Sequence, residues 1–292
     1  MKVIFSYIEF NHHFFCNLEM AKLANLCAQK HGYKTCLYTD ENGYKKLTPY
    51  VNYDEVILFD KEVVAQLNPN IWSMGKILAM SMVKEPFVHI DFDLFLLKPL
   101  PNDFIDKDFF SLYPEPWLFQ IPYYEKGILK IYKLYPHPEE LDFKDFSSYN
   151  FAVVGGQKFK EINFVCNRLL DFSIMHGKTL EKFLDKESYH KPIQKQLFSH
   201  PWSLAVIFEQ ILIKNLLHGI FNIEISTLSG SEFFRDLHYS DLAEGPSLNL
   251  TKKCTKYLKD LFVEKGILHL HGLKSDKSVN PILNNISKKY LM

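Results

Sequence analysis

The sequence predicts an α/β protein whose central sheet is mixed, mostly parallel and flanked by helices. A strand-like apolar run at 3–8 precedes a helical segment at about 17–31, and a second strand-like run follows at 35–40. Strand, helix and strand in this order form a βαβ unit, whose two strands are parallel. The residues at 41–43 signal a turn, and a third strand-like run follows at 55–60. The N-terminal strands are therefore expected to lie in a parallel sheet.

The next segments predict a helix followed by a buried strand. Apolar residues recur at spacings of three and four, as one face of a helix requires; they are Ile71, Met74, Leu78 and Met82. Pro86 is expected to end this helix, because the residue before a proline disfavours helical geometry. The run at 87–97 is apolar around a polar centre, so we expect one buried strand there.

The remaining elements are expected at intervals along the rest of the chain. They are a strand at 151–156, helices at about 161–175 and 203–217, and strands near 221–226 and 267–271. No internal repeat, low-complexity tract or linker divides the sequence. We therefore expect a single domain over 1–292, with a less regular portion from about residue 221.

Composition and charge narrow the class of protein. Of the 292 residues, 47% are hydrophobic and 15% are aromatic, which is enough for a large core. Lys plus Arg and Asp plus Glu both number 34, and no basic stripe stands out, so we expect no nucleic-acid partner. The five cysteines form no C-x-x-C pair and their number is odd, which is typical of reduced thiols in a cytoplasmic protein.

The sequence predicts no transmembrane segment. The first ten residues lack a small-residue cleavage site, so we interpret them as a buried strand and not as a signal peptide. The apolar stretch at 204–213 is interrupted by charge and is shorter than the roughly 18 apolar residues that span a bilayer. Peripheral attachment to a membrane stays open, and we expect a cytoplasmic location.

Two acidic residues within the run at 87–97 are the most informative feature of the sequence. On one strand, Asp91 and Asp93 point to the same side, opposite their apolar neighbours. Two like charges are costly to bury together unless a positive ion lies between them, and oxygen ligands suit Mn²⁺ or Mg²⁺. Such a cation could bridge the diphosphate of a nucleotide-sugar. The alternative is a pair of solvated carboxylates at a strand end.

Four segments in this order resemble glycosyltransferases of the GT-A fold, which is Rossmann-like. They are similar to the retaining family eight type, with the glycogenins and bacterial galactosyltransferases, and comprise the Asp-x-Asp, YNFAVVGG at 149–156, FEQILIKN at 208–215 and LHLHGLK at 268–274. A W-x-x-G-K helix before the Asp-x-Asp also resembles a group of uncharacterised bacterial glycosyltransferase-like proteins. The resemblance implies metal-dependent transfer of a sugar from a nucleotide-sugar, with a UDP-sugar as the expected donor. The implied acceptor is a saccharide or glycan, and the implied stereochemistry is retention.

The resemblance also implies roles for three residues near the reacting sugar. Asn150 would line the sugar pocket, and Glu209 and Gln210 would lie beside the donor sugar and the acceptor. In a retaining enzyme of this fold the leaving phosphate can take the acceptor's proton, so Glu209 would position the acceptor hydroxyl. In an inverting enzyme Glu209 would instead be the general base.

The last segment would complete the metal and diphosphate site by the same resemblance. His269 and His271 share one face of the predicted strand, and the spacing to Gly272 favours His269 as the metal ligand. Gly272 would let the backbone approach a phosphate, and Lys274 would reach the diphosphate. The alternatives are histidines that only form hydrogen bonds at a strand end and a surface lysine.

Four other residues are expected to contact the nucleotide. Tyr7 ends the first predicted strand, and Thr39 and Asp40 end the second, where open α/β sheets bind nucleotides. Lys76 lies on the helix before the Asp-x-Asp, from which it could reach the diphosphate. The alternatives are a helix cap for Asp40 and a solvated helix surface for Lys76.

Two rival functions follow from the same residues. His89, Asp91 and Asp93 would alternate on one strand face and could form a metal site on their own, as in a metal-dependent phosphohydrolase. A non-catalytic sugar-binding protein with the same fold is the second rival.

Overall fold

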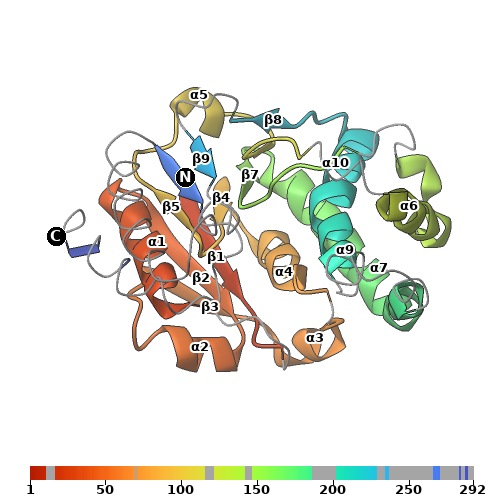
Figure 1. Ribbon diagram of the computed structural model, residues 1–292, viewed down its shortest axis with the longest axis horizontal. Coiled ribbons are helices and arrows are strands. Elements are labelled where there is room, and N and C mark those ends of the chain that lie inside the picture. The colour runs from red at the N-terminus through yellow and green to blue at the C-terminus, as the bar shows by residue number, and fades with distance from the viewer. Residues whose placement is uncertain are drawn as a thin grey trace, which may run out of the picture.

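A computed structural model describes most of the chain (Figure 1). The described residues are 1–10, 17–69, 71–115, 122–141, 147–185, 202–228, 234–236, 266–269, 283 and 287–288. Within them, helices cover both faces of a central sheet, and a smaller sheet is formed by three further strands.

The central sheet of the described residues has seven strands in the order β3-β2-β1-β4-β7-β6-β8. In chain order these are β1 (Lys2–Tyr7), β2 (Lys34–Thr39), β3 (Glu55–Leu58), β4 (Phe87–Ile90), β6 (Phe110–Ser111), β7 (Val153–Gly156) and β8 (Ser226–Thr227). The strands β1 to β4 run parallel, β6 is parallel to β8, and β7 is antiparallel to β4 and β6. The predicted α/β class, with a mixed, mostly parallel sheet flanked by helices, is therefore confirmed.

The helices lie in two layers, one on each face of the sheet. In chain order the described helices are α1 (Leu18–Lys30), α2 (Glu41–Leu47), α3 (Lys61–Gln66), α4 (Met74–Met82), α5 (Asn102–Ile105), α6 (Pro122–Leu134), η2 (Pro138–Glu140), α7 (Phe159–Asp185), α9 (Trp202–Val206), η3 (Ile207–Leu212) and α10 (Ile213–Phe221). Figure 1 shows α1 on one side of the sheet and α4, α7 and α10 on the other. The helix α6 was not among the predicted elements.

Burial of both sheet faces explains why the first strands are continuous apolar runs. In β1, Ile4 packs into the core shared with α4 and α7, whereas Val3 and Phe5 pack into the core shared with α1. A strand covered on both faces gains from apolar side chains at every position, because each one is removed from water. The predicted strands at the N-terminus are therefore confirmed.

The predicted turn at 41–43 is wrong, because these residues form the first turn of α2. Asp40 has an extended backbone, and its Oδ1 accepts a hydrogen bond from the backbone N–H of Gly43 at 2.9 Å. This is the contact of a helix N-cap, and Glu41 adds favourable negative charge in the first helical turn. The cap therefore outweighs the turn preference of the residues that follow it.

The single strand predicted at 87–97 is two strands separated by a turn. The strand β4 ends at Ile90, and β5 begins at Leu94, whose backbone N–H donates to the carbonyl oxygen of Asp91 at 3.1 Å. The strand β5 (Leu94–Leu96) leaves the central sheet and pairs with β10 (Ile267–His269), which in turn pairs with β9 (Phe234–Asp236). The two aspartates therefore lie in the turn between β4 and β5 and do not alternate on one strand.

The helix predicted at 203–217 continues to Phe221 and replaces the strand predicted near 221–226. Asn222 ends α10 in the left-handed region with a φ of 54°, and β8 begins only at Ser226. The segment Leu204–Phe221 has a mean hydropathy of 1.5 and is long enough to cross a membrane, but 78% of it is buried inside the protein. The core helix of a folded domain has the same properties, so this segment is weak evidence for a membrane span.

Candidate functional site

The strand order places a topological switch point between β1 and β4. The chain runs from β1 outward through β2 and β3 and then returns to form β4 on the other side of β1. Ligands of open α/β sheets bind outside the carboxyl ends of the strands at such a point. Tyr7 ends β1, and Asp91 directly follows the end of β4, so the predicted acidic segment lies at the switch point.

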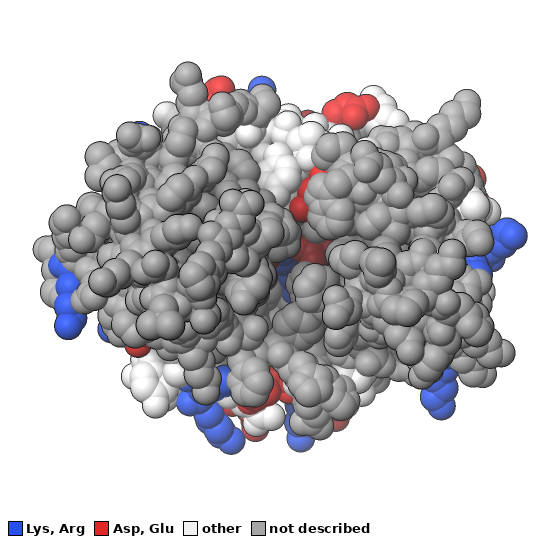
Figure 2. Space-filling view, in the orientation of Figure 1, with Lys and Arg blue, Asp and Glu red and all other residues white. Residues whose placement is uncertain are grey.

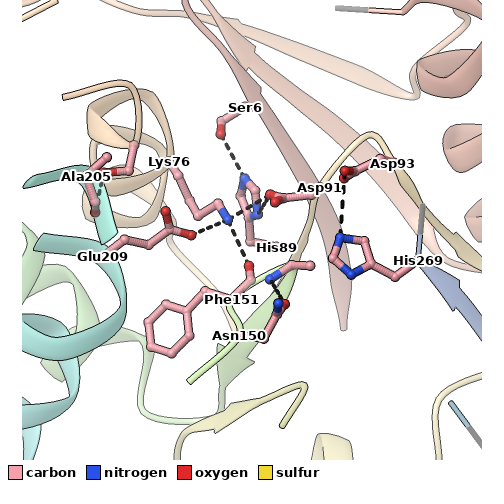
Figure 3. A network of polar contacts seen from close by, with 12 residues as sticks. Ser6, Lys76, His89, Asp91, Asp93, Asn150, Phe151, Ala205, Glu209 and His269 are labelled. Carbon is pink, nitrogen blue, oxygen red and sulfur yellow. Dashed lines mark hydrogen bonds and ion pairs between the residues drawn. The ribbon is translucent and has the colours of Figure 1, made fainter. Parts of the chain in front are cut away.

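A buried lysine forms the centre of the polar network at this point (Figure 3). Lys76 is 4% exposed, and its Nζ lies 2.7 Å from Oδ1 of Asp91, 2.5 Å from Oε1 of Glu209 and 2.8 Å from the carbonyl oxygen of Phe151. Burial alone would lower the pKa of Lys76, but the charges of Asp91 and Glu209 raise it above its usual value. The ammonium is therefore charged and offsets two carboxylates.

A buried histidine links the two strands at the switch point. Nε2 of His89, on β4, lies 2.8 Å from Oγ of Ser6, on β1, and Nδ1 lies 3.8 Å from Oδ1 of Asp91. Figure 3 shows this imidazole between Ser6 and Asp91. Ser6 was not among the predicted site residues, although a small polar residue near the carboxyl end of an otherwise apolar strand is a signal for one.

Asp93 lies in the turn just before β5, opposite His269. The side chain of Asp93 is fully buried, and its Oδ2 is 3.7 Å from Nε2 of His269. The pairing of β5 with β10 brings them together, because Leu94 is the register partner of His269. The rival phosphohydrolase site is not supported, since Asp93 lies beyond the strand that carries His89 and the three side chains do not share a strand face.

Asp93 and His269 are a donor pair that suits a divalent cation. Their separation of 3.7 Å exceeds a hydrogen bond, and two ligands at about 2.1 Å from one octahedral ion lie roughly 3 Å apart, so a small shift would let them share an ion. In the described part of the chain, no three His, Cys, Asp or Glu side chains could hold a metal ion. A metal site at Asp91, Asp93 and His269 therefore stays a prediction.

The side chain of Asn150 is engaged within the protein. Its Nδ2 donates to Oε1 of Glu115 at 2.6 Å and to the hydroxyl of Tyr113 at 3.2 Å, and its Oδ1 accepts from the backbone N–H of Ala152 at 2.9 Å. These contacts use both amide hydrogens and fix the turn that leads into β7. Asn150 thus lies near the Phe151 carbonyl that Lys76 contacts, and nothing in the sequence pattern indicated the buried Glu115.

Gln210 and Glu209 lie on the π-helical segment η3. Both side chains are buried, and Oε1 of Gln210 has no hydrogen-bond partner among the described residues. A buried amide oxygen without a hydrogen bond costs free energy, and π-helical turns are frequent at functional sites. This oxygen could therefore accept a hydrogen bond from a bound ligand.

The residues expected to contact a base or ribose lie beside helix α2. Thr39 is fully buried, and a Cβ at Gly43 would lie 2.1 Å from its Oγ1 and 2.6 Å from Cδ1 of Tyr7. The helix thus packs closely onto both side chains only because Gly43 has none. Lys46 donates to the hydroxyl of Tyr7 at 2.9 Å, and Asp40 caps the helix. A nucleotide role for these residues stays a prediction.

Three predicted residues lie outside the described residues: His271, Gly272 and Lys274. The described cysteines, Cys27, Cys36 and Cys166, are free and buried, and burial raises the pKa of the Cys27 and Cys36 thiols to about 12. Figure 2 shows acidic and basic atoms both scattered over one face, without a large area of one sign among the described residues. This agrees with the balanced charge of the sequence.

The fold and the site define an α/β protein with an acidic centre, bridged by a lysine, at the carboxyl ends of its parallel strands. Residues 5–286 match the family described as "Family of unknown function (DUF6734)", and the chain belongs to this family. No curated protein matches the chain.

One solved structure to which the chain is similar is the galactosyltransferase LgtC in complex with donor and acceptor sugar analogs. The identity is 11% and the TM-score is 0.46, over 98% of this chain and 96% of that chain. At this identity and TM-score, the likeness concerns only the overall path of the backbone and says nothing about activity.

Proposed function

We propose that this protein is a metal-dependent glycosyltransferase that uses a nucleotide-sugar donor. The donor is a UDP-sugar, the acceptor is a saccharide or glycan, and the sugar is transferred with retention. The observation that supports this most directly is the fully buried carboxylate of Asp93, 3.7 Å from His269 at the switch point of the sheet. The motifs around Asp91, Glu209 and His269 support the same function by their resemblance to the retaining enzymes.

Asp93 and His269 would hold the cation. Asp91, whose Oδ1 contacts Lys76, would join them through its second carboxylate oxygen only after a shift of its side chain, because the described residues hold no ready three-residue metal site. When bound, a divalent cation would stabilise the negative charge that develops on the leaving nucleoside diphosphate. Burial strengthens this electrostatic effect, because little water surrounds the carboxylate of Asp93. Gly272 and Lys274 are proposed to contact the same diphosphate.

Glu209 is proposed to position the acceptor, and Gln210 to accept a hydrogen bond from the sugar or the acceptor. In the transfer, the bond from the anomeric carbon to the diphosphate oxygen breaks, and that oxygen keeps the electron pair. The acceptor oxygen bonds to the anomeric carbon on the same face, and its proton passes to the leaving diphosphate. The ammonium 2.5 Å from Glu209 favours the ionised form of its carboxylate, which suits a hydrogen-bond acceptor better than a base.

Incubation with a panel of nucleotide-sugars tests this proposal. We expect release of UDP from a UDP-sugar that requires Mn²⁺, stops on addition of EDTA and rises when a suitable acceptor is present. The measurement is UDP released over time, with and without a panel of saccharide acceptors. Release of inorganic phosphate from simple phosphoesters would instead support a phosphohydrolase, and binding of UDP-sugars without turnover would support a non-catalytic sugar-binding protein.

A further inference from the structure

We propose that Lys76 is a positioning residue, whose ammonium fixes Glu209 and Asp91 at the switch point and does not bind the diphosphate. This inference rests on the proposed function, because it assigns Glu209 to the acceptor hydroxyl. It changes the expected role of Lys76 from a contact with the donor to a contact within the protein.

The hydrogen-bond donors of Lys76 are all used within the protein. A lysine ammonium has three N–H groups, and Lys76 has three protein acceptors within 2.8 Å: Oδ1 of Asp91, Oε1 of Glu209 and the carbonyl oxygen of Phe151. The acceptors lie on three separate segments of the chain, and the ammonium contacts all three (Figure 3). A phosphate oxygen could bind Lys76 only if one of these contacts broke.

The positive charge of Lys76 balances two carboxylates in the buried site. Lys76 and Glu209 are 4% and 2% exposed, and the Asp91 side chain is 14% exposed. Two carboxylates and one ammonium carry a net charge of about one negative unit, and without the ammonium the carboxylates would repel each other in a region with little water. The ammonium of Lys76 must therefore lie between the two carboxylates before any ligand binds.

Lys76 joins three segments that are far apart in the sequence. Asp91 follows β4, Phe151 precedes β7, and Glu209 belongs to the π-helical turn η3, which lies far away in the sequence. A π-helical turn presents its side chains differently from an α-helix and needs local support. The contact at 2.5 Å sets the position of the Glu209 carboxylate relative to Asp91. A shift of about 1 Å in a group at a reacting centre can lower the rate about 100-fold.

The test compares binding of UDP with turnover in Lys76→Met. We expect the Kd for UDP in the presence of Mn²⁺, measured by calorimetry, to change less than about threefold, because the cation is proposed to rest mainly on Asp93 and His269. UDP release from a UDP-hexose should fall about 100-fold, because Glu209 loses its support. Lys76→Arg, which keeps the charge, should recover a substantial part of the turnover. In a Glu209→Gln background, Lys76→Met should reduce turnover little further, because residues that act through one another are not additive.

Lys2→Met is the matched control, because Lys2 also joins two carboxylates, those of Glu55 and Glu85, at the opposite end of β1. We expect it to leave UDP binding and turnover unchanged. If Lys76→Met fails to fold, Lys76→Met with Glu209→Gln removes one charge of each sign and serves for the binding measurement. A rise of more than about tenfold in the Kd for UDP, or equal multiplicative losses in both backgrounds, overturns the inference. Absence of Mn²⁺-dependent UDP binding by the wild type overturns the proposed function and this inference with it.

Discussion

Replacing Asp93 by asparagine is expected to abolish the stabilisation of the protein by Mn²⁺ together with UDP. The carboxamide has nearly the same shape, so the buried site keeps its packing, but it lacks the charge that holds a divalent cation. Loss of a group that stabilises developing charge costs about 100- to 1000-fold in turnover, and we expect a loss of this size. Because a ligand that binds only the folded state raises the melting temperature, a thermal-shift assay measures the binding part directly.

The control for this prediction is Asp103→Asn, which neutralises an exposed aspartate on α5. It should keep the shift in melting temperature caused by Mn²⁺ and UDP. An Asp93→Asn protein that still shows the full shift would mean that Asp93 does not hold the cation.

Replacing Lys76 by methionine is expected to lower the free energy of unfolding by about 3–5 kcal/mol, the usual cost of removing one partner from a buried ion pair. The change leaves Asp91 and Glu209 close together without the ammonium that lies 2.7 and 2.5 Å from them. Urea unfolding followed by circular dichroism measures the loss. Adding Glu209→Gln removes one of the two remaining carboxylates and should restore part of the stability.

The contribution of Lys76 to the free energy of unfolding is expected to depend on pH. The pKa of Lys76 is raised in the folded protein above its ordinary value of 10.5, so its contribution is fully present below that pH. The contribution is lost as the pH rises from 10.5 through the higher pKa of the folded state. The difference between wild type and Lys76→Met should therefore be constant from pH 7 to pH 9 and shrink above about pH 10.5. A difference below about 1 kcal/mol at pH 7 would contradict the buried ion pairs.

The first half of the sheet could be predicted from the sequence because its signals are local. The strands β1, β2 and β4 are apolar runs since both faces are buried, and α1 and α4 follow from apolar periodicity. The break between β4 and β5 could not be predicted, because the apolar pattern continues through it. The break is decided by pairing of β5 with β10, a partner distant in the sequence.

The sequence indicated which residues form the site, but not which of them contact one another. The sequence indicated Asp91 and Asp93 as the acidic centre of the site, but it placed them on one strand, whereas they follow the end of β4. The burial of Lys76 could not be predicted, because a lysine on a helix is usually solvated, and the Asp91 and Glu209 carboxylates that make its burial favourable come from distant parts of the sequence. The sequence likewise left open whether Asp40 contacts a nucleotide or caps a helix, and in the structure it caps α2.

A crystal grown with MnCl₂ and UDP, with anomalous data collected at the manganese edge, tests the central claim most directly. We expect one anomalous peak within about 2.0–2.3 Å of a carboxylate oxygen of Asp93 and of Nε2 of His269, with diphosphate oxygens as further ligands. A map in which UDP is bound but no manganese lies at this pair, or in which the metal is held elsewhere, would contradict the account.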